Sequence, residues 1–195
     1  MPDRFQQVEI ANRAELRRWL EANHAQASSI WLLTWKKGDP RYVPYGEIVE
    51  EVLCFGWIDS LPRKLDETRT MLRLSPRRAG SAWSKVNREK AENMIRMGRM
   101  HPSGLAKIEA ARRDGDWDRL ESADTLTVPA DLAAALRDHP PAEQEWGAFP
   151  KSAQRGILEW ILQAKRPETR ARRILETAQL AARGERANQW RPKAG

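Results

Sequence analysis

Cysteine is nearly absent from this 195-residue chain, in which Cys54 is the single example. One thiol forms no internal disulfide and cannot supply the several cysteines of a zinc or iron–sulfur site. Long apolar runs are also missing. The mean hydropathy is -0.73, and no stretch approaches the ~20 apolar residues of a membrane-spanning helix. The N-terminus lacks a basic start followed by an apolar run, so we expect no secretory signal and a cytoplasmic protein.

Nucleotide-binding and metal-binding motifs are missing as well. No Gly-x-Gly-x-x-Gly and no Gly-x-x-x-x-Gly-Lys-Ser/Thr segment occurs, so neither a dinucleotide site nor a P-loop is supported. The three histidines, His24, His101 and His139, are far apart, and no His-x-x-x-His or His-x-Glu pair occurs to supply two metal ligands from one helix. We expect them to be surface or helix-capping residues, and we expect no metal and no cofactor.

Charge is abundant and unevenly distributed, with a net charge of +7. Residues 1–75 carry 11 basic and 11 acidic side chains, whereas residues 76–115 carry ten and four. Residues 116–149 carry two basic and eight acidic side chains, and residues 150–195 carry 11 and four. Two basic blocks therefore flank one acidic block. Either the blocks neutralise each other, which charge alone favours, or the basic blocks bind an anionic partner such as nucleic acid.

Apolar periodicity predicts an α+β fold, with a small mixed β-sheet and packed helices in the N-terminal part and an all-helical C-terminal part. A capping box from Asn12 to Glu15 opens a helix that ends near residue 23, and a second helix runs from Pro44 to Gly56. Strands are expected at 30–37, 57–59 and 68–75, with the last pairing through a turn with 63–65. Further helices are expected at 84–97, 102–113, 129–138, 141–146, 152–164 and 167–183.

The same pattern predicts how the chain is divided. We expect an α+β part at 1–115, an acidic connector at 116–128, a helical part at 129–184 and a flexible tail at 185–195. Acidic residues of the connector are expected to contact Arg or Lys from 76–115 or 150–183: Asp116, Asp118, Glu121 and Asp124. Such contacts, together with burial of neighbouring apolar residues, would make one compact unit.

The loop from Ser75 to Asn87 holds the densest set of anion-binding groups. Its candidate ligand-binding residues are Arg77, Arg78, Ser81, Trp83, Ser84, Lys85 and Asn87. Free N–H groups at the start of the following helix favour an anion, and Trp83 offers an aromatic face to a base or a sugar. The structural alternative carries equal weight: Arg77 or Arg78 pairs with Asp59, and Trp83 anchors the loop in the core.

A second basic element comprises Lys165, Arg166, Arg170 and Arg173. The last three recur at four- and three-residue spacing and form one cationic face of a helix. Like charges on one face destabilise an isolated helix, so acidic residues of 116–149 or an external ligand should face them. This helix is also a candidate surface for an acidic protein partner.

Three further features have both a structural and a functional interpretation. Trp57 and Asp59, at the end of an apolar strand, are further candidate ligand-binding residues. Asp59 can also act as a general base or, as we favour, pair with an arginine. Cys54 has no histidine partner in the sequence, which favours a buried core thiol over a nucleophile. A cluster of three carboxylates is predicted to face solvent on an amphipathic helix: Glu47, Glu50 and Glu51.

Several blocks together resemble the YdeI/OmpD-associated, or bacteriocin-protection (OmdA-like), family. They are residues 53–60 (Leu-Cys-Phe-Gly-Trp-Ile-Asp-Ser), 75–87, 98–100 with 104–105, and 160–174. The resemblance implies a bacterial protein with a role in protection against antimicrobial peptides and association with an outer-membrane porin. It implies no reaction, cofactor or catalytic residue. A direct porin contact would require export, for which the sequence shows no signal.

These observations favour a protein that binds an anionic ligand (nucleic acid, a nucleotide or an envelope precursor) in stress or antimicrobial-peptide protection. The alternatives are an enzyme that uses Asp59 with the Arg77 and Arg78 loop, and a protein-binding adaptor that uses the basic 165–173 helix. No paired acid–base or nucleophile constellation is visible, so a binding protein is favoured over an enzyme. An enzyme would place Asp59, Trp57 and one of the two arginines around a single deep pocket.

Overall fold

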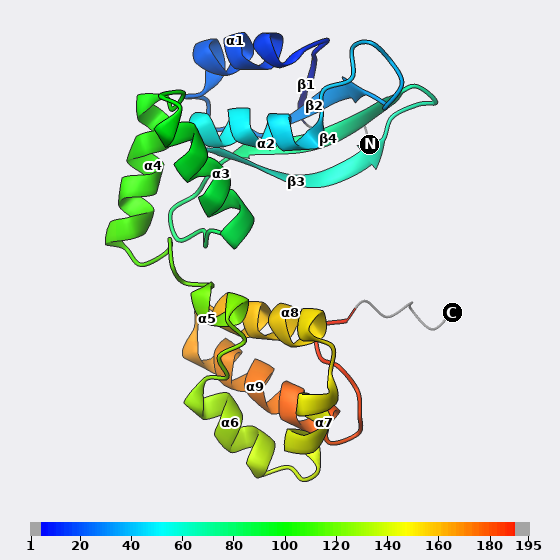
Figure 1. Cartoon of the computed structure of the whole chain (residues 1–195), viewed down its shortest axis with the longest axis vertical. Helices are drawn as coiled ribbons and strands as arrows, with labels where there is room; N and C mark the ends of the chain where they lie inside the picture. The colour runs from blue at the N-terminus through cyan, green and yellow to red at the C-terminus, as the bar shows by residue number, and fades with distance from the viewer. Residues whose placement is uncertain (1–4, 190–195) are drawn as a thin grey trace. The chain divides into compact units, whose positions relative to one another are not determined.

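The computed structural model of the chain describes residues 5–189 and divides into two compact units, Met1–Trp117 and Asp118–Gly195 (Figure 1). Each unit has its own apolar core. The expectation of one compact unit is therefore wrong. Residues 190–195 of the predicted tail lie outside the described part, and Ala187, within that tail, is buried in the core of the second unit.

The first unit contains a four-stranded mixed sheet, which confirms the α+β prediction. Its strands are β1 (Gln6–Glu9), β2 (Ile30–Trp35), β3 (Trp57–Lys64) and β4 (Arg69–Pro76), in the order β1-β2-β4-β3. β1 pairs with β2 in parallel, and the other pairs are antiparallel. The inner position expected for 30–37 is confirmed, whereas β1 was not predicted.

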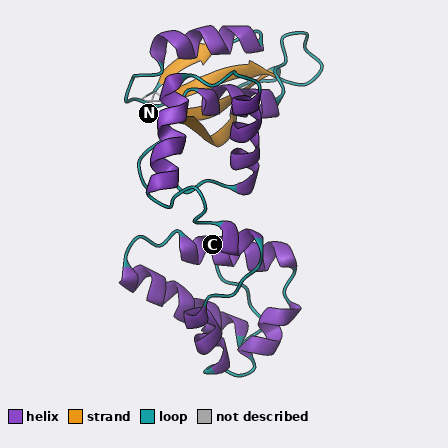
Figure 2. Ribbon diagram, turned by 60° about the vertical axis from the view of Figure 1, so that its left-hand side comes forward, coloured by secondary structure: helices purple, strands orange, loops and turns teal. Residues whose placement is uncertain are grey.

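Two helices cover one face of this sheet, α1 (Arg13–Asn23) and α2 (Tyr45–Cys54), as Figures 1 and 2 show. Leu16 and Leu20 of α1 and Ile48 and Val52 of α2 pack with the sheet residues of that face in one core cluster. Asn12 caps α1 by accepting a hydrogen bond from the Glu15 N–H, and the Glu15 carboxylate accepts in return from the Ala11 N–H at 2.7 Å, one residue before the N-cap that a standard capping box uses. Helix α2 ends where Gly56 adopts a φ of +77°, a left-handed conformation that favours glycine.

The predicted solvent-facing glutamates are corrected by the structure, because Glu51 is completely buried. Its carboxylate accepts hydrogen bonds from Arg13 Nε (2.6 Å), Arg17 Nη1 (3.0 Å) and Arg99 Nη2 (2.6 Å). A buried carboxylate needs such partners to offset its desolvation. Glu51 therefore joins α1 and α2 to the segment that follows α3.

The remaining helices of the first unit are α3 (Lys85–Arg96) and α4 (Pro102–Arg113). Trp83, Val49, Leu53 and Ile108 belong to a separate core cluster that includes residues of α2, α3 and α4. His101 caps α4 by accepting a hydrogen bond from the Ser103 N–H, as expected for a capping histidine.

In the described residues of the second unit, all the regular secondary structure is helical. The unit contains α5 (Glu121–Asp124), α6 (Ala130–Arg137), α7 (Ala142–Ala148), α8 (Lys151–Leu162) and α9 (Pro167–Ala181). All but the short α5 were predicted. Helix α9 packs against α6, α7 and α8, and their apolar faces form one core.

Acidic residues of the 116–149 block do pair with basic residues, as expected. Asp124 contacts Arg155 of α8 at 2.9 Å. Asp131 of α6 accepts two hydrogen bonds from Arg170 of α9, at 2.8 and 2.9 Å, and these contacts lower the pKa of Asp131. Both pairs hold helices together within the second unit. In residues 5–189, no helix is long and apolar enough to cross a membrane.

Candidate functional site

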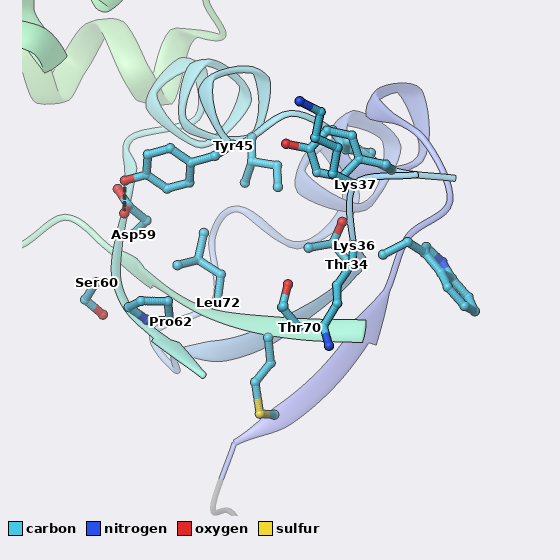
Figure 3. A pocket seen from close by; sticks show the side chains of 14 residues that line it. Thr34, Lys36, Lys37, Tyr45, Asp59, Ser60, Pro62, Thr70 and Leu72 are labelled. Carbon is cyan, nitrogen blue, oxygen red and sulfur yellow. Dashed lines mark hydrogen bonds between the residues drawn. The ribbon is translucent and has the colours of Figure 1, made fainter. Parts of the chain in front are cut away.

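A cleft of about 460 Å³ opens on the helix-covered face of the sheet in the first unit (Figure 3). This volume lies within the ~300–1,000 Å³ typical of small-molecule sites. Its walls come from β2, β3, β4, the first turns of α2 and the segment 36–43 between β2 and α2. Apolar and aromatic groups predominate in its lining: Trp35, Tyr42, Val43, Ile48, Pro62, Met71 and Leu72.

The cleft exists because α2 begins at Tyr45 and leaves the ends of the strands uncovered by helix. Thr34 and Thr70 are register partners at the ends of β2 and β4, and Leu72 is the partner of Pro62 on β3. These four residues line the cleft, and the segment 36–43 borders it. An uncovered apolar patch bordered by polar residues is typical of a binding surface.

One end of the cleft is formed by Tyr45 and Asp59. The Tyr45 phenol donates a 2.7 Å hydrogen bond to Asp59 Oδ2, and Figure 3 shows the two side chains pointing toward each other. Partial burial and this bond to a carboxylate raise the pKa of Tyr45 to about 12, because both disfavour the phenolate. Tyr45 is therefore a neutral donor at physiological pH. Asp59 Oδ1 accepts no hydrogen bond from any described residue and is available to a donor in the cleft.

The other end of the cleft carries a hydroxyl and two lysines, Thr34, Lys36 and Lys37 (Figure 3). Thr34 is 7% exposed, and its Oγ1 has no hydrogen-bond partner among residues 5–189. A buried hydroxyl without a partner costs about 1–3 kcal/mol. The Lys36 ammonium donates to the carbonyls of Asp66 and Glu67 in the β3–β4 turn, whereas Lys37 is exposed and forms no ion pair within the described residues.

The residues of the predicted anion-binding loop lie elsewhere in the first unit. Arg77 is 3% exposed, donates from Nη1 to the carbonyls of Ser81 and Ala82, and lies 3.8 Å over the Trp83 ring. With Arg78 it lines a separate cavity of about 60 Å³. In the described residues, neither arginine forms an ion pair with Asp59.

Trp83 offers no face to a base or a sugar, because it is completely buried and its ring packs 4.8 Å from Trp117. Ser84 is the N-cap of α3 and accepts a hydrogen bond from the Asn87 N–H at 3.3 Å. Lys85 is exposed beside Glu89. The tryptophan and the serine therefore have structural roles in the loop.

Trp57 and Asp59, neighbours in the sequence, lie in different environments. Trp57 is 1% exposed in the core, where its Nε1 donates to the His24 carbonyl at 3.0 Å. Asp59 lines the large cleft, and Arg77 and Arg78 line the small cavity. The constellation expected of an enzyme, with Asp59, Trp57 and an arginine around one pocket, is not assembled in this structure.

The basic 165–173 element belongs to the second unit. Arg170 pairs with Asp131, and Arg173 donates to the Trp160 carbonyl while its guanidinium lies 4.9 Å from the Trp160 ring. Lys165 and Arg166 are exposed. The structure thus commits two of the four side chains to contacts within this unit.

Nucleophilic and metal chemistry gain no support from the described residues. Cys54 is fully buried, as expected for a core thiol, and burial raises its pKa to about 11. No group of three or more histidine, cysteine or carboxylate side chains that could hold a metal ion occurs in residues 5–189.

The sequence-based interpretation singled out Asp59 but not Thr34, Lys37 or Tyr45. One signal was available, since Thr34 interrupts the apolar run Ile30–Leu33 of a strand expected to be inner. A polar residue on a buried strand needs a partner. The proximity of Tyr45 and Asp59 could not be found in this way, because it depends on how α2 lies over the sheet.

Two family models match the chain. Residues 8–107, just over half of it, match a domain of unknown function, DUF8412. Residues 125–184 match the bacteriocin-protection, YdeI or OmpD-associated (OmdA) model. The chain therefore belongs to the DUF8412 family, and its C-terminal part carries a match to the OmdA domain. No curated protein and no solved structure matches it significantly.

The two matches divide the motifs that carried the resemblance. Residues 53–60 and 75–87 lie within the DUF8412 domain, and residues 160–174 lie within the OmdA domain. The cleft belongs entirely to the DUF8412 domain, whereas the basic 165–173 helix belongs to the OmdA domain.

Proposed function

We propose that the DUF8412 domain binds a small organic anion with an apolar body in the cleft between Tyr45 and Lys37. The observation that carries this proposal is Thr34, whose buried hydroxyl has no hydrogen-bond partner in residues 5–189 and lines the cleft. A ligand oxygen that accepts from this hydroxyl would remove the cost of leaving it unpaired.

The charge and polarity of the lining support the choice of ligand class. The middle of the cleft is apolar and contributes about 25 cal/mol for each Å² of apolar ligand surface that it removes from water. Lys37, which lines the Thr34 end of the cleft, supplies an exposed cation that forms no ion pair within residues 5–189. Asp59 Oδ1, at the opposite end, suits a hydroxyl or amide donor of the same ligand.

Nucleic acid is less well supported as the anionic ligand. Stacking platforms for single strands need exposed aromatic rings beside basic groups, and Trp83 of the basic loop is fully buried. The cleft can accommodate a metabolite-sized group rather than a duplex. The description of the OmdA match links residues 125–184 to bacteriocin protection, and we propose that capture of the anion serves such a protective role.

The proposal is tested by ligand-observed NMR with matched pairs of small compounds. Aryl-alkyl carboxylates should bind, and the amides and amines with the same apolar body should bind at least tenfold more weakly. Fluorescence anisotropy with labelled oligonucleotides at two salt concentrations provides the comparison with nucleic acid. Equal binding of carboxylate and amine, or tight salt-dependent binding of oligonucleotides alone, would overturn the proposal.

Variants then locate the site. Thr34→Val removes one hydroxyl at constant volume, and Lys37→Gln removes one charge. Both should weaken carboxylate binding, Thr34→Val without loss of stability because the hydroxyl has no partner to lose. Lys64→Gln is the matched control, since Lys64 is exposed on β3 and does not line the cleft.

A further inference from the structure

Arg77 has unused hydrogen-bonding capacity in the interior of the first unit. Arg77 is only 3% exposed, and of its guanidinium nitrogens only Nη1 has acceptors, the carbonyls of Ser81 and Ala82. Nε and Nη2 have no partner among residues 5–189. A guanidinium stays protonated even here, although burial lowers its pKa to about 10. A buried cation with two free donors is costly unless a partner completes it.

The free donors belong to a residue that lines a small cavity. This cavity measures about 60 Å³, which is more than the ~10–15 Å³ that one water molecule needs and far less than the ~300–1,000 Å³ of small-molecule sites. Its other polar lining residues include Arg78, Ser81 and Lys107. The space therefore suits one small ion and excludes a metabolite of the size that the large cleft accepts.

The carboxylates in the lining do not use the free donors. Asp114 contacts Arg113 at 3.1 Å, and the backbone carbonyl of Asp116 accepts from the Trp83 N–H. The Asp116 charge opposes the lowering of the Arg77 pKa but leaves Nε and Nη2 without a hydrogen bond. Three cationic and two anionic side chains line the cavity, so its formal charge is positive.

We infer that this cavity is a binding site for one small oxyanion, held by the Nε and Nη2 donors of Arg77 and completed by Arg78 and Lys107. Nε and Nη2 share one edge of the planar guanidinium, the edge that binds two oxygens of a phosphate, sulfate or carboxylate in parallel. The site is independent of the proposed function, because none of its residues lines the large cleft.

The ring of Trp83 makes the site measurable, since the Arg77 guanidinium lies 3.8 Å from its centroid. Inorganic phosphate, sulfate and acetate are titrated at constant ionic strength, with tryptophan fluorescence and the melting temperature as readouts. Phosphate should raise the melting temperature and change the fluorescence in a saturable way, beyond the effect of chloride. Comparison of the three anions distinguishes a tetrahedral from a carboxylate ligand.

Two variants and a control decide the outcome. Arg77→Lys keeps the charge but removes the two parallel N–H donors of the guanidinium edge, and it should lower phosphate affinity at least tenfold. Arg78→Gln with Lys107→Gln changes exposed side chains only and should also lower it several-fold, whereas the exposed control Arg96→Gln should not. Wild-type affinity in the double variant, or a phosphate effect no larger than that of chloride, would overturn the assignment even if Arg77→Lys did not fold.

Discussion

The phenol of Tyr45, in the first turn of α2, donates a 2.7 Å hydrogen bond to Asp59 of β3. This contact joins the helix to the sheet at one end of the cleft and fixes the position of both side chains. Tyr45 is nevertheless 57% exposed, so a ligand can reach the pair from solvent. The rest of the cleft lining reaches from this pair to Lys37.

The ionisation of Tyr45 tests this contact directly. The chain has two tyrosines, so Tyr42→Phe leaves Tyr45 as the single phenol in an ultraviolet titration. We expect a pKa of about 12 for Tyr45, and a lower value in Asp59→Asn, where the charged acceptor is lost. Because the pKa in the folded protein exceeds the ordinary value of 10, the stability that Tyr45 contributes is complete below pH 10 and falls as the pH rises toward 12. An unchanged pKa in Asp59→Asn would contradict the contact.

Glu51 is predicted to be the most sensitive of the three glutamates of α2. Glu51→Ala leaves Arg13, Arg17 and Arg99 without their shared buried acceptor. Breaking a buried ion pair costs about 3–5 kcal/mol, and the partial exposure of the arginines places the loss near the lower end. Urea unfolding measures it, with Glu47→Ala, whose side chain is 41% exposed, as the control within about 1 kcal/mol of wild type. Equal losses in both variants would refute the structural role of Glu51.

Gly104 is predicted to tolerate no side chain. A Cβ at this position would lie 2.1 Å from the Cys54 carbonyl oxygen and 2.7 Å from its carbon, since α4 packs closely on the end of α2. Gly104→Ala should destabilise the first unit by about 1–3 kcal/mol. Gly156→Ala in α8 is the counterpart, because its Cβ would meet nothing within 4 Å and should stabilise the second unit by about 0.5–1 kcal/mol. Calorimetry measures the stability of both variants, which should change in opposite directions. A Gly104→Ala variant as stable as wild type would show that α4 lies farther from Cys54.

Cys54 should react with thiol reagents only when the first unit unfolds. Its side chain is fully buried, and a pKa of about 11 keeps the thiolate scarce at pH 8. The reaction with Ellman's reagent is therefore expected to be slow in the native protein and immediate in denaturant. Rapid labelling of the native chain would mean that the thiol is accessible.

Most of the elements could be predicted because their signals are local. The capping residues Asn12 and Glu15, the left-handed Gly56 and the proline that opens α9 each mark an end within a few residues of sequence. Strand β1 was missed because its four residues are defined by parallel pairing with a strand more than 20 residues away. Short, non-local pairing leaves little trace in the sequence.

The errors at candidate sites have a different physical origin. The helical period correctly places Glu51 opposite the apolar face of α2, but it cannot show that arginines from α1 and from the segment after α3 cover that side. Trp83 has an aromatic ring of the kind that stacks on bases, but it is buried because apolar residues of three helices pack around it. The cleft was missed because its walls come from separate strands and from α2.

The central claim is that an organic anion binds in the cleft, and chemical-shift mapping tests it most directly. The aryl-alkyl carboxylate that binds most tightly is titrated into ¹⁵N-labelled protein. The account predicts shift changes concentrated at residues 34–45, 59–62 and 70–72, and their loss in Thr34→Val. Changes confined to residues 77–85 or 165–173, or the same changes in Thr34→Val as in wild type, would contradict it.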